Sequence, residues 1–163
     1  MFLGITPFGM FHTVISLVAV AAGGAALIRD GRITPRNRIG MLYVLMTVAT
    51  CITGFFIFHH GGFGKPHALG IITLVVLAMA GVAGYTSWMG RFSAHVETIA
   101  YSLTLFFHMI PAFTETATRV PPAAPLAAGP DAPGLQATIG VAFLVFLVGA
   151  VVQVRRLRRT GTP

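Results

Sequence analysis

The sequence predicts an all-α integral membrane protein, a helical bundle with a four-helix core and a fifth transmembrane helix on its flank. Of its 163 residues, 55% are hydrophobic and only 9% are charged, whereas a soluble domain carries about 25% charged residues. Crossing the bilayer hydrocarbon takes about 20 apolar residues, and the chain contains five apolar runs of about that length. The single cysteine excludes an internal disulfide.

The five predicted spans follow one another through short or turn-rich connections. They are expected at about residues 10–28, 39–58, 67–89, 97–113 and 136–154. A loop rich in Pro and Ala, at residues 121–135, has no periodicity and is expected to be extended. The chain therefore divides into a four-helix transmembrane core at residues 1–120, this extracytoplasmic loop, and a fifth transmembrane helix with a basic cytoplasmic tail at residues 136–163.

The basic residues predict how the bundle is oriented. Alternating spans place nine of the eleven Lys and Arg residues on one side: Arg29, Arg32, Arg36, Arg38, Arg91, Arg155, Arg156, Arg158 and Arg159. The other side receives only Lys65 and Arg119. Because positive charge marks cytoplasmic segments, we expect a bacterial inner-membrane protein with its N-terminus outside and its C-terminus in the cytoplasm. Topology also accounts for the net charge of +7, so no nucleic acid is expected as a partner.

Histidines provide the main functional indication. Topology places five of the six in the outer half of the bundle: His12, His59, His60, His67 and His108. The sixth, His95, is expected in a cytoplasmic loop. Imidazole ligates both metals and haem. We therefore take His12, His60, His67 and His108 as candidate ligands of haem b or of a transition metal, copper or zinc.

Simpler interpretations exist for the same residues. Histidines near the headgroups need no ligand, and His108 would be satisfied by a hydrogen bond to a Ser, a Thr or a backbone carbonyl of a neighbouring helix. Glu115 forms a surface pair with Arg119, orients a ligand histidine through a hydrogen bond to its other ring nitrogen, or accepts a proton at the outer mouth. Pro111 is expected to kink the helix near His108.

Aromatic and acidic residues are expected at the cytoplasmic end. Tyr43, Tyr85 and Trp88 are predicted to anchor the second and third helices at the membrane interface. Glu97 is expected to begin the fourth helix, where a carboxylate suits the helix dipole. It would form a small polar cluster there with His95. The catalytic residues, if the protein is an enzyme, are not identified by any motif.

A resemblance covers about residues 12–113. The segment Arg38-Ile39-Gly40-Met41-Leu42-Tyr43-Val44-Leu45-Met46, preceded by His12 and Gly31 and followed by His67-Ala68-Leu69, Thr73 and His95, resembles a family of small bacterial multi-pass membrane proteins of unknown function. Members often have His-Arg where this chain has Asn37-Arg38. The resemblance implies a four-helix core with histidines at helix ends and implies no particular reaction.

Three functions fit these patterns. The first is a haem- or metal-binding protein of electron transfer, using the outward histidines. The second is a non-catalytic accessory subunit of a larger respiratory or photosynthetic membrane complex. The third is a metal or proton carrier, or a maturation factor for a metalloenzyme. The expected partners are the lipid bilayer and either other membrane subunits or further copies of this chain.

Overall fold

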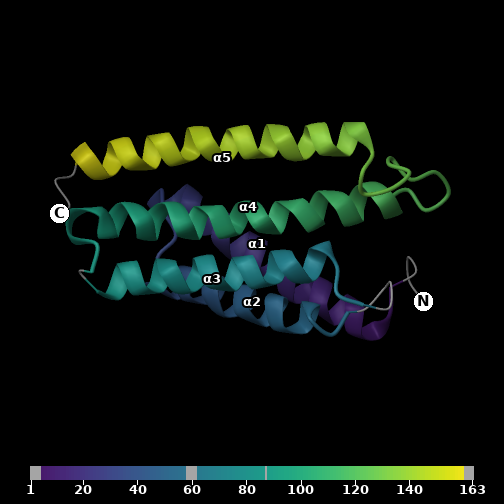
Figure 1. Ribbon diagram of the computed structural model, residues 1–163, viewed down its shortest axis with the longest axis horizontal. Helices are drawn as coiled ribbons and strands as arrows, with labels where there is room; N and C mark the ends of the chain where they lie inside the picture. The colour runs from purple at the N-terminus through teal and green to yellow at the C-terminus, as the bar shows by residue number, and fades with distance from the viewer. Residues whose placement is uncertain (1–4, 58–61, 87, 160–163) are drawn as a thin grey trace.

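The structure, a computed structural model, describes residues 5–57, 62–86 and 88–159. Its regular elements in these ranges are helical, which confirms the all-α prediction (Figure 1). The helices are α1 (Pro7–Asp30), α2 (Arg38–Gly54), α3 (Lys65–Tyr85), the short 3-10 helix η1 (Gly90–Phe92), α4 (Ser93–Arg119) and α5 (Pro133–Arg159).

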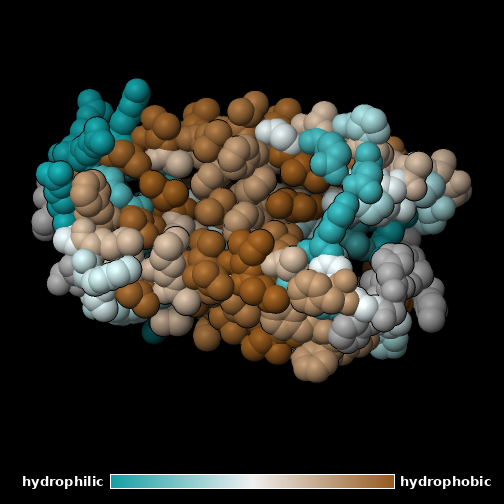
Figure 2. All heavy atoms as spheres, in the orientation of Figure 1, coloured by the Kyte–Doolittle hydropathy of each residue, from teal (hydrophilic) through white to brown (hydrophobic). Residues whose placement is uncertain are grey.

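Successive helices run in opposite directions, so the two ends of the bundle differ in charge. The C-terminal ends of α1, α3 and α5 lie at the same end as the N-terminal ends of α2 and α4 (Figure 1). This arginine end receives the nine arginines that were predicted on one side. Figure 2 shows a hydrophobic band between two hydrophilic ends. Four helices, α1, α3, α5 and α4 with η1, are long and apolar enough to cross a membrane, while α2 is a shorter apolar helix.

Local sequence determines where the first two helices begin and end. Thr6 caps α1 by accepting a hydrogen bond from the Gly9 N–H at 3.1 Å, and Asn37 caps α2 in the same way through Gly40. Gly31 ends α1 with a φ of 70°, a left-handed conformation that favours glycine.

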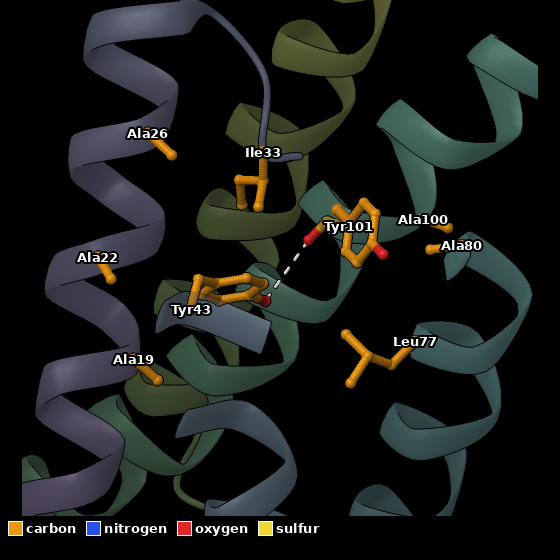
Figure 3. Close-up of a cluster of buried hydrophobic side chains, with 9 residues drawn as sticks. All are labelled: Ala19, Ala22, Ala26, Ile33, Tyr43, Leu77, Ala80, Ala100 and Tyr101. Carbon is orange, nitrogen blue, oxygen red and sulfur yellow. Dashed lines mark hydrogen bonds between the residues drawn. The ribbon is translucent and has the colours of Figure 1, made fainter. Parts of the chain in front are cut away.

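Four helices form a ring, and α5 lies outside it. Along the ring α1 packs against α2, α2 against α3, α3 against α4, and α4 against α1, while α5 packs on α4. The helices α2 and α4 are therefore diagonal neighbours across the centre. Small residues of α1, Ala19, Ala22 and Ala26, are buried in the core beside Tyr43 and Tyr101 (Figure 3).

Several helix bounds differ from the expected ones. The second helix ends at Gly54 and the chain turns at Phe55 and Phe56, because glycine is a weak helix former. The fourth helix is longer at both ends and continues through Pro111. Residues 121–132 are not simply extended: they contain turns, and the Ala127 N–H donates to the Ala117 carbonyl at 2.9 Å, which holds the loop against the end of α4.

Candidate functional site

Hydroxyl, imidazole and carboxyl groups occupy the centre of the ring, where a helical bundle usually buries aliphatic side chains. We call this set the polar column. It consists of Glu97, Tyr101, Thr104 and His108 of α4, Tyr43, Thr47, Thr50 and Thr53 of α2, and His12 and Ser16 of α1. The α4 members recur every three or four residues, and this spacing places them on one face of the helix.

The middle of the polar column is a run of two hydrogen-bonded pairs across the diagonal. The Tyr43 hydroxyl lies 2.7 Å from the Thr104 hydroxyl. The Thr47 hydroxyl lies 3.1 Å from Nε2 of His108. Tyr43, Thr47 and Thr104 are fully buried, and His108 is 7% exposed. The run therefore lies within the protein and away from lipid.

The backbone carbonyl of Tyr101, in α4, also bonds to this run. The Thr104 hydroxyl donates to the Tyr101 carbonyl at 2.8 Å, and the Tyr43 hydroxyl lies 3.5 Å from the same oxygen, as drawn in Figure 3. The Tyr43 and His108 rings meet edge to face, with centroids 6.2 Å apart. His108 lies about 22 Å along α4 from Ser93 and about 16 Å from Arg119 at 1.5 Å per residue. It is therefore near mid-depth in the bundle.

A second group of polar contacts joins α1 to α2 in the other half of the bundle. Nδ1 of His12 lies 2.8 Å from the Thr53 hydroxyl, and the Ser16 hydroxyl lies 3.4 Å from that of Thr50. Gly54 makes room for the imidazole, because a Cβ at that position would lie 3.3 Å from Cε1 of His12.

At the arginine end, the last member of the polar column, Glu97, forms an ion pair with Arg36. The side chain of Glu97 is 8% exposed and accepts a hydrogen bond from Arg36 at 2.5 Å. Arg36 also donates to the Gly84 carbonyl and to the Thr34 hydroxyl. A side chain at Gly84 would collide with the Glu97 carboxylate. This pair thus connects the loop after α1 with α3 and α4.

The structure places the predicted histidines in different surroundings. His12 and His108 lie in the polar column. His67 is buried in the first turn of α3, where its Nδ1 accepts a hydrogen bond from the Gly64 N–H at 3.2 Å. His59 and His60 lie outside the described residues. His95 belongs to the first turn of α4 and not to a loop as predicted, because that helix begins at Ser93.

The histidines of the described part of the chain do not gather around one point. Within residues 5–57, 62–86 and 88–159, no group of three or more His, Cys, Asp or Glu side chains is placed to hold one metal ion. His12 and His108 are bound by Thr53 and Thr47, which lie about 9 Å apart along α2. The four-histidine site with His60 therefore stays a prediction.

The remaining sequence-based expectations have mixed outcomes. The Glu115–Arg119 surface pair is present at 2.5 Å. Glu97 does not begin α4: it is buried one turn inside the helix. Tyr43 is not an interfacial anchor, because it is fully buried, whereas Tyr85 and Trp88 are 65% and 76% exposed.

Sequence reasoning missed the hydroxyl groups that hold the imidazoles. Thr47, Thr53 and Thr104 do not interrupt an apolar run, so they attract no notice in a hydropathy profile. A signal was nevertheless present, since Tyr43 and Thr47 are four residues apart and so are Thr104 and His108. Polar residues at helical spacing within an apolar span indicate a face directed away from lipid.

No family model, curated protein or solved structure matches this chain. The functional argument therefore depends on the geometry of the polar column.

Proposed function

We propose that this chain is a bacterial inner-membrane protein that conducts protons along the polar column, with His108 as the group that takes up and releases the proton. One observation carries the proposal: the His108 imidazole, near mid-depth, is hydrogen-bonded to the buried Thr47 hydroxyl, and one helical turn away the buried hydroxyls of Tyr43 and Thr104 form a second pair. Hydroxyl groups both donate and accept hydrogen bonds, and a neutral imidazole donates at one ring nitrogen and accepts at the other. A buried imidazole inside a membrane bundle is typical of a proton relay.

The side chains of the polar column are the groups that would carry the proton in turn. A proton that reaches the Glu97 end passes to the run of Thr104, Tyr43 and Thr47 and then to His108. Each hydroxyl accepts a proton on oxygen and releases its own to the next group, so no atom is consumed. His108 binds the proton at one ring nitrogen and releases one from the other. In this proposal, water would bridge the steps that no direct hydrogen bond spans, including the step from Tyr43 to Thr47.

The orientation of the path follows from the charges. We place the arginine end in the cytoplasm, because positive residues mark cytoplasmic segments. The N-terminus is then outside and the C-terminus inside. Glu97 and Arg36 form the cytoplasmic end of the column, while His12 and Glu115 lie toward the outer mouth.

Vesicles of the purified full chain, loaded with a pH-sensitive dye, test this function. A potassium diffusion potential set with valinomycin should drive protons through the wild-type protein. The His108→Gln variant keeps a hydrogen-bonding side chain for Thr47 but cannot exchange a proton, so its flux should fall to the level of empty vesicles. The Thr73→Val variant is the matched control, because Thr73 is buried in α3 and its hydroxyl bonds to the Leu69 carbonyl. Equal flux in wild type and His108→Gln would contradict the proposal.

A second candidate, redox chemistry at His12, has its own supporting observation. Thr53 holds Nδ1 of His12 and leaves Nε2 for a ligand, the arrangement usual for a histidine that binds metal or haem. In this case His12 would be one ligand of haem b or of a copper or zinc ion, which would supply electron transfer or metal binding. Absorption spectra of the purified protein, oxidised and dithionite-reduced, together with elemental analysis, would show a Soret band or a stoichiometric metal. A folded preparation with neither would exclude this candidate.

The geometry favours proton conduction over a shared histidine site. Thr47 and Thr53 hold His108 and His12 at different depths along α2, and among the described residues no group of three or more His, Cys, Asp or Glu side chains is placed to hold one metal ion. A hydrogen-bonded run does not require them to converge.

A further inference from the structure

A pocket at the arginine end lies apart from the polar column and shares no residue with it. It has a volume of about 510 Å³ and is lined by Asp30, Gly31, Arg32, Thr98, Gln153, Arg156, Leu157 and Arg159. Small-molecule sites typically measure about 300 to 1,000 Å³. The pocket forms where the end of α5 meets the loop after α1.

The base of the pocket is fixed by a polar contact. Gln153 is 7% exposed. Its amide nitrogen donates to the Gly31 carbonyl at 3.0 Å, and its amide oxygen accepts from the Ser102 hydroxyl at 3.0 Å. One buried side chain therefore ties α5 to α4 and to the loop. Arg156 lies directly against Gly31, because a Cβ there would meet its guanidinium at 2.5 Å.

The charge of the pocket suits an anion. Three guanidinium groups, those of Arg32, Arg156 and Arg159, line it, and the one carboxylate is that of Asp30. That carboxylate already accepts hydrogen bonds from Arg29, at 2.7 and 2.8 Å, and from Asn37 at 3.0 Å. The pocket therefore has an excess of positive charge. Guanidinium is the side-chain group best matched to phosphate oxygens.

The surroundings of the pocket favour a phosphate attached to a lipid. The hydrophobic band of the bundle begins next to the hydrophilic arginine end, where the pocket lies (Figure 2). The helices α1 and α5 both contact α4, but within the described residues they do not contact each other. Acyl chains can therefore lie along apolar surface next to the pocket, and basic pockets of this kind at the cytoplasmic side bind anionic headgroups.

We infer that this pocket binds a phosphoryl group, the headgroup phosphate of an anionic phospholipid, through Arg32, Arg156 and Arg159. The bound lipid would hold the end of α5 to the loop after α1 from the membrane side. The inference does not depend on proton conduction, because the two sites are separate.

Calorimetric titration of the detergent-purified full chain tests the inference with three probes: dihexanoyl phosphatidylglycerol, dihexanoyl phosphatidylcholine and inorganic phosphate. Phosphatidylglycerol should bind with about one molecule per chain, and phosphatidylcholine should bind at least tenfold more weakly. Tighter binding of phosphatidylglycerol than of inorganic phosphate identifies the lipid as the source of the phosphoryl group. Equal affinity identifies free phosphate and still supports the shared chemistry. Equal binding of the two lipids would overturn the inference.

The chain offers a matched pair of variants on the same helix. The double variant Arg156→Gln/Arg159→Gln removes two pocket arginines, whereas Arg155→Gln/Arg158→Gln removes two exposed arginines that do not line the pocket. Both lower the net charge by two. The first should bind phosphatidylglycerol roughly 30-fold more weakly, and the second should bind within about threefold of wild type. An equal loss in both would show diffuse attraction and no site. If the first double variant does not fold, the single variant Arg32→Gln, in the loop, gives an independent measurement: it should also bind phosphatidylglycerol more weakly than wild type.

Discussion

The two sides of α4 contact their neighbours through opposite chemistry. Toward the centre of the ring, Thr104 and His108 meet the hydroxyls of Tyr43 and Thr47. Toward α5, Phe106 packs on Phe143 and Phe146 with ring centroids 5.3 and 5.9 Å apart. Both contacts use the same stretch of α4, at similar depth in the bundle.

The α5 side shows what packing alone requires. Aromatic side chains hold α5 against α4 there, with a hydrogen bond from Ser102 to Gln153 nearer the arginine end. Packing against α4 therefore does not require hydroxyls and imidazoles, which are costly to bury unless they are hydrogen-bonded. Their concentration in the centre is the reason to assign that region a function.

After the loss of His108 itself, the largest expected effect comes from Thr47→Val, which removes the hydroxyl held by His108 at nearly constant volume. Proton flux in vesicles should fall about 100-fold, because general acid–base catalysis loses roughly 10²-fold or more when a participating group is removed. Thr47→Ser, which restores the hydroxyl, should recover most of the flux. Normal flux in Thr47→Val would show that the hydroxyl is only a packing element.

The ion pair at the arginine end should give the largest effect on stability. Arg36→Ala leaves the Glu97 carboxylate buried without its guanidinium, and removal of one partner of a buried pair costs about 3–5 kcal/mol. Because Arg36 is 46% exposed, we expect about 2–3 kcal/mol in the free energy of unfolding, measured by denaturation in mixed micelles. Arg38→Ala removes a neighbouring exposed arginine and should cost less than about 0.5 kcal/mol. Equal effects of the two variants would show that the pair does not stabilise the column.

Adjacent glycines of α1 allow a test of how closely the ring surrounds the column. A Cβ at Gly23 would lie 2.9 Å from both Leu105 and Tyr43, whereas nothing lies within 4 Å of a Cβ at Gly24. Gly23→Val should therefore destabilise the protein by about 1–3 kcal/mol and displace Tyr43 from Thr104. Gly24→Val should have little effect on unfolding in the same micelles. A larger loss at Gly24 would mean that α1 is rotated relative to the structure.

The smallest effect is expected on the α5 side. Phe143→Leu removes one ring from the aromatic contact with Phe106, which is worth about 0.5–1.5 kcal/mol. Separation of α5 from the core should become easier by that amount, as measured by protease sensitivity of the loop at residues 121–132. Proton flux should be unchanged, since the column lies on the other side of α4. A flux loss comparable to that of Thr47→Val would remove the distinction between the two sides.

Hydropathy predicted the long helices because their apolar composition is continuous over about 20 residues. It predicted the ends of α1, α3 and α5 within about five residues. It failed at the start of α4, where His95 was assigned to a loop and Glu97 to the beginning of the helix. Glu97 is buried one turn inside the helix, where its carboxylate pairs with Arg36, which lies 61 residues away in sequence.

The candidate site was predicted only in part for a similar reason. His12 and His108 stand out in an apolar sequence, whereas the threonines that bind them do not. Tyr43 was assigned to the membrane interface because hydropathy gives the depth of a residue but not the side of the helix that it occupies. That side depends on how α2 faces α4 across the ring, and this contact joins residues about 60 positions apart.

The most direct test of the central claim compares one buried polar residue on each side of α4. Proton flux in vesicles should be measured for His108→Gln, at the centre, and for Gln153→Leu, between α4 and α5. If the polar column conducts protons, His108→Gln should reduce the flux to the level of empty vesicles, while the flux of Gln153→Leu should stay within about twofold of wild type. Equal flux in the two variants, whether both are active or both inactive, would contradict the assignment of proton conduction to the polar column.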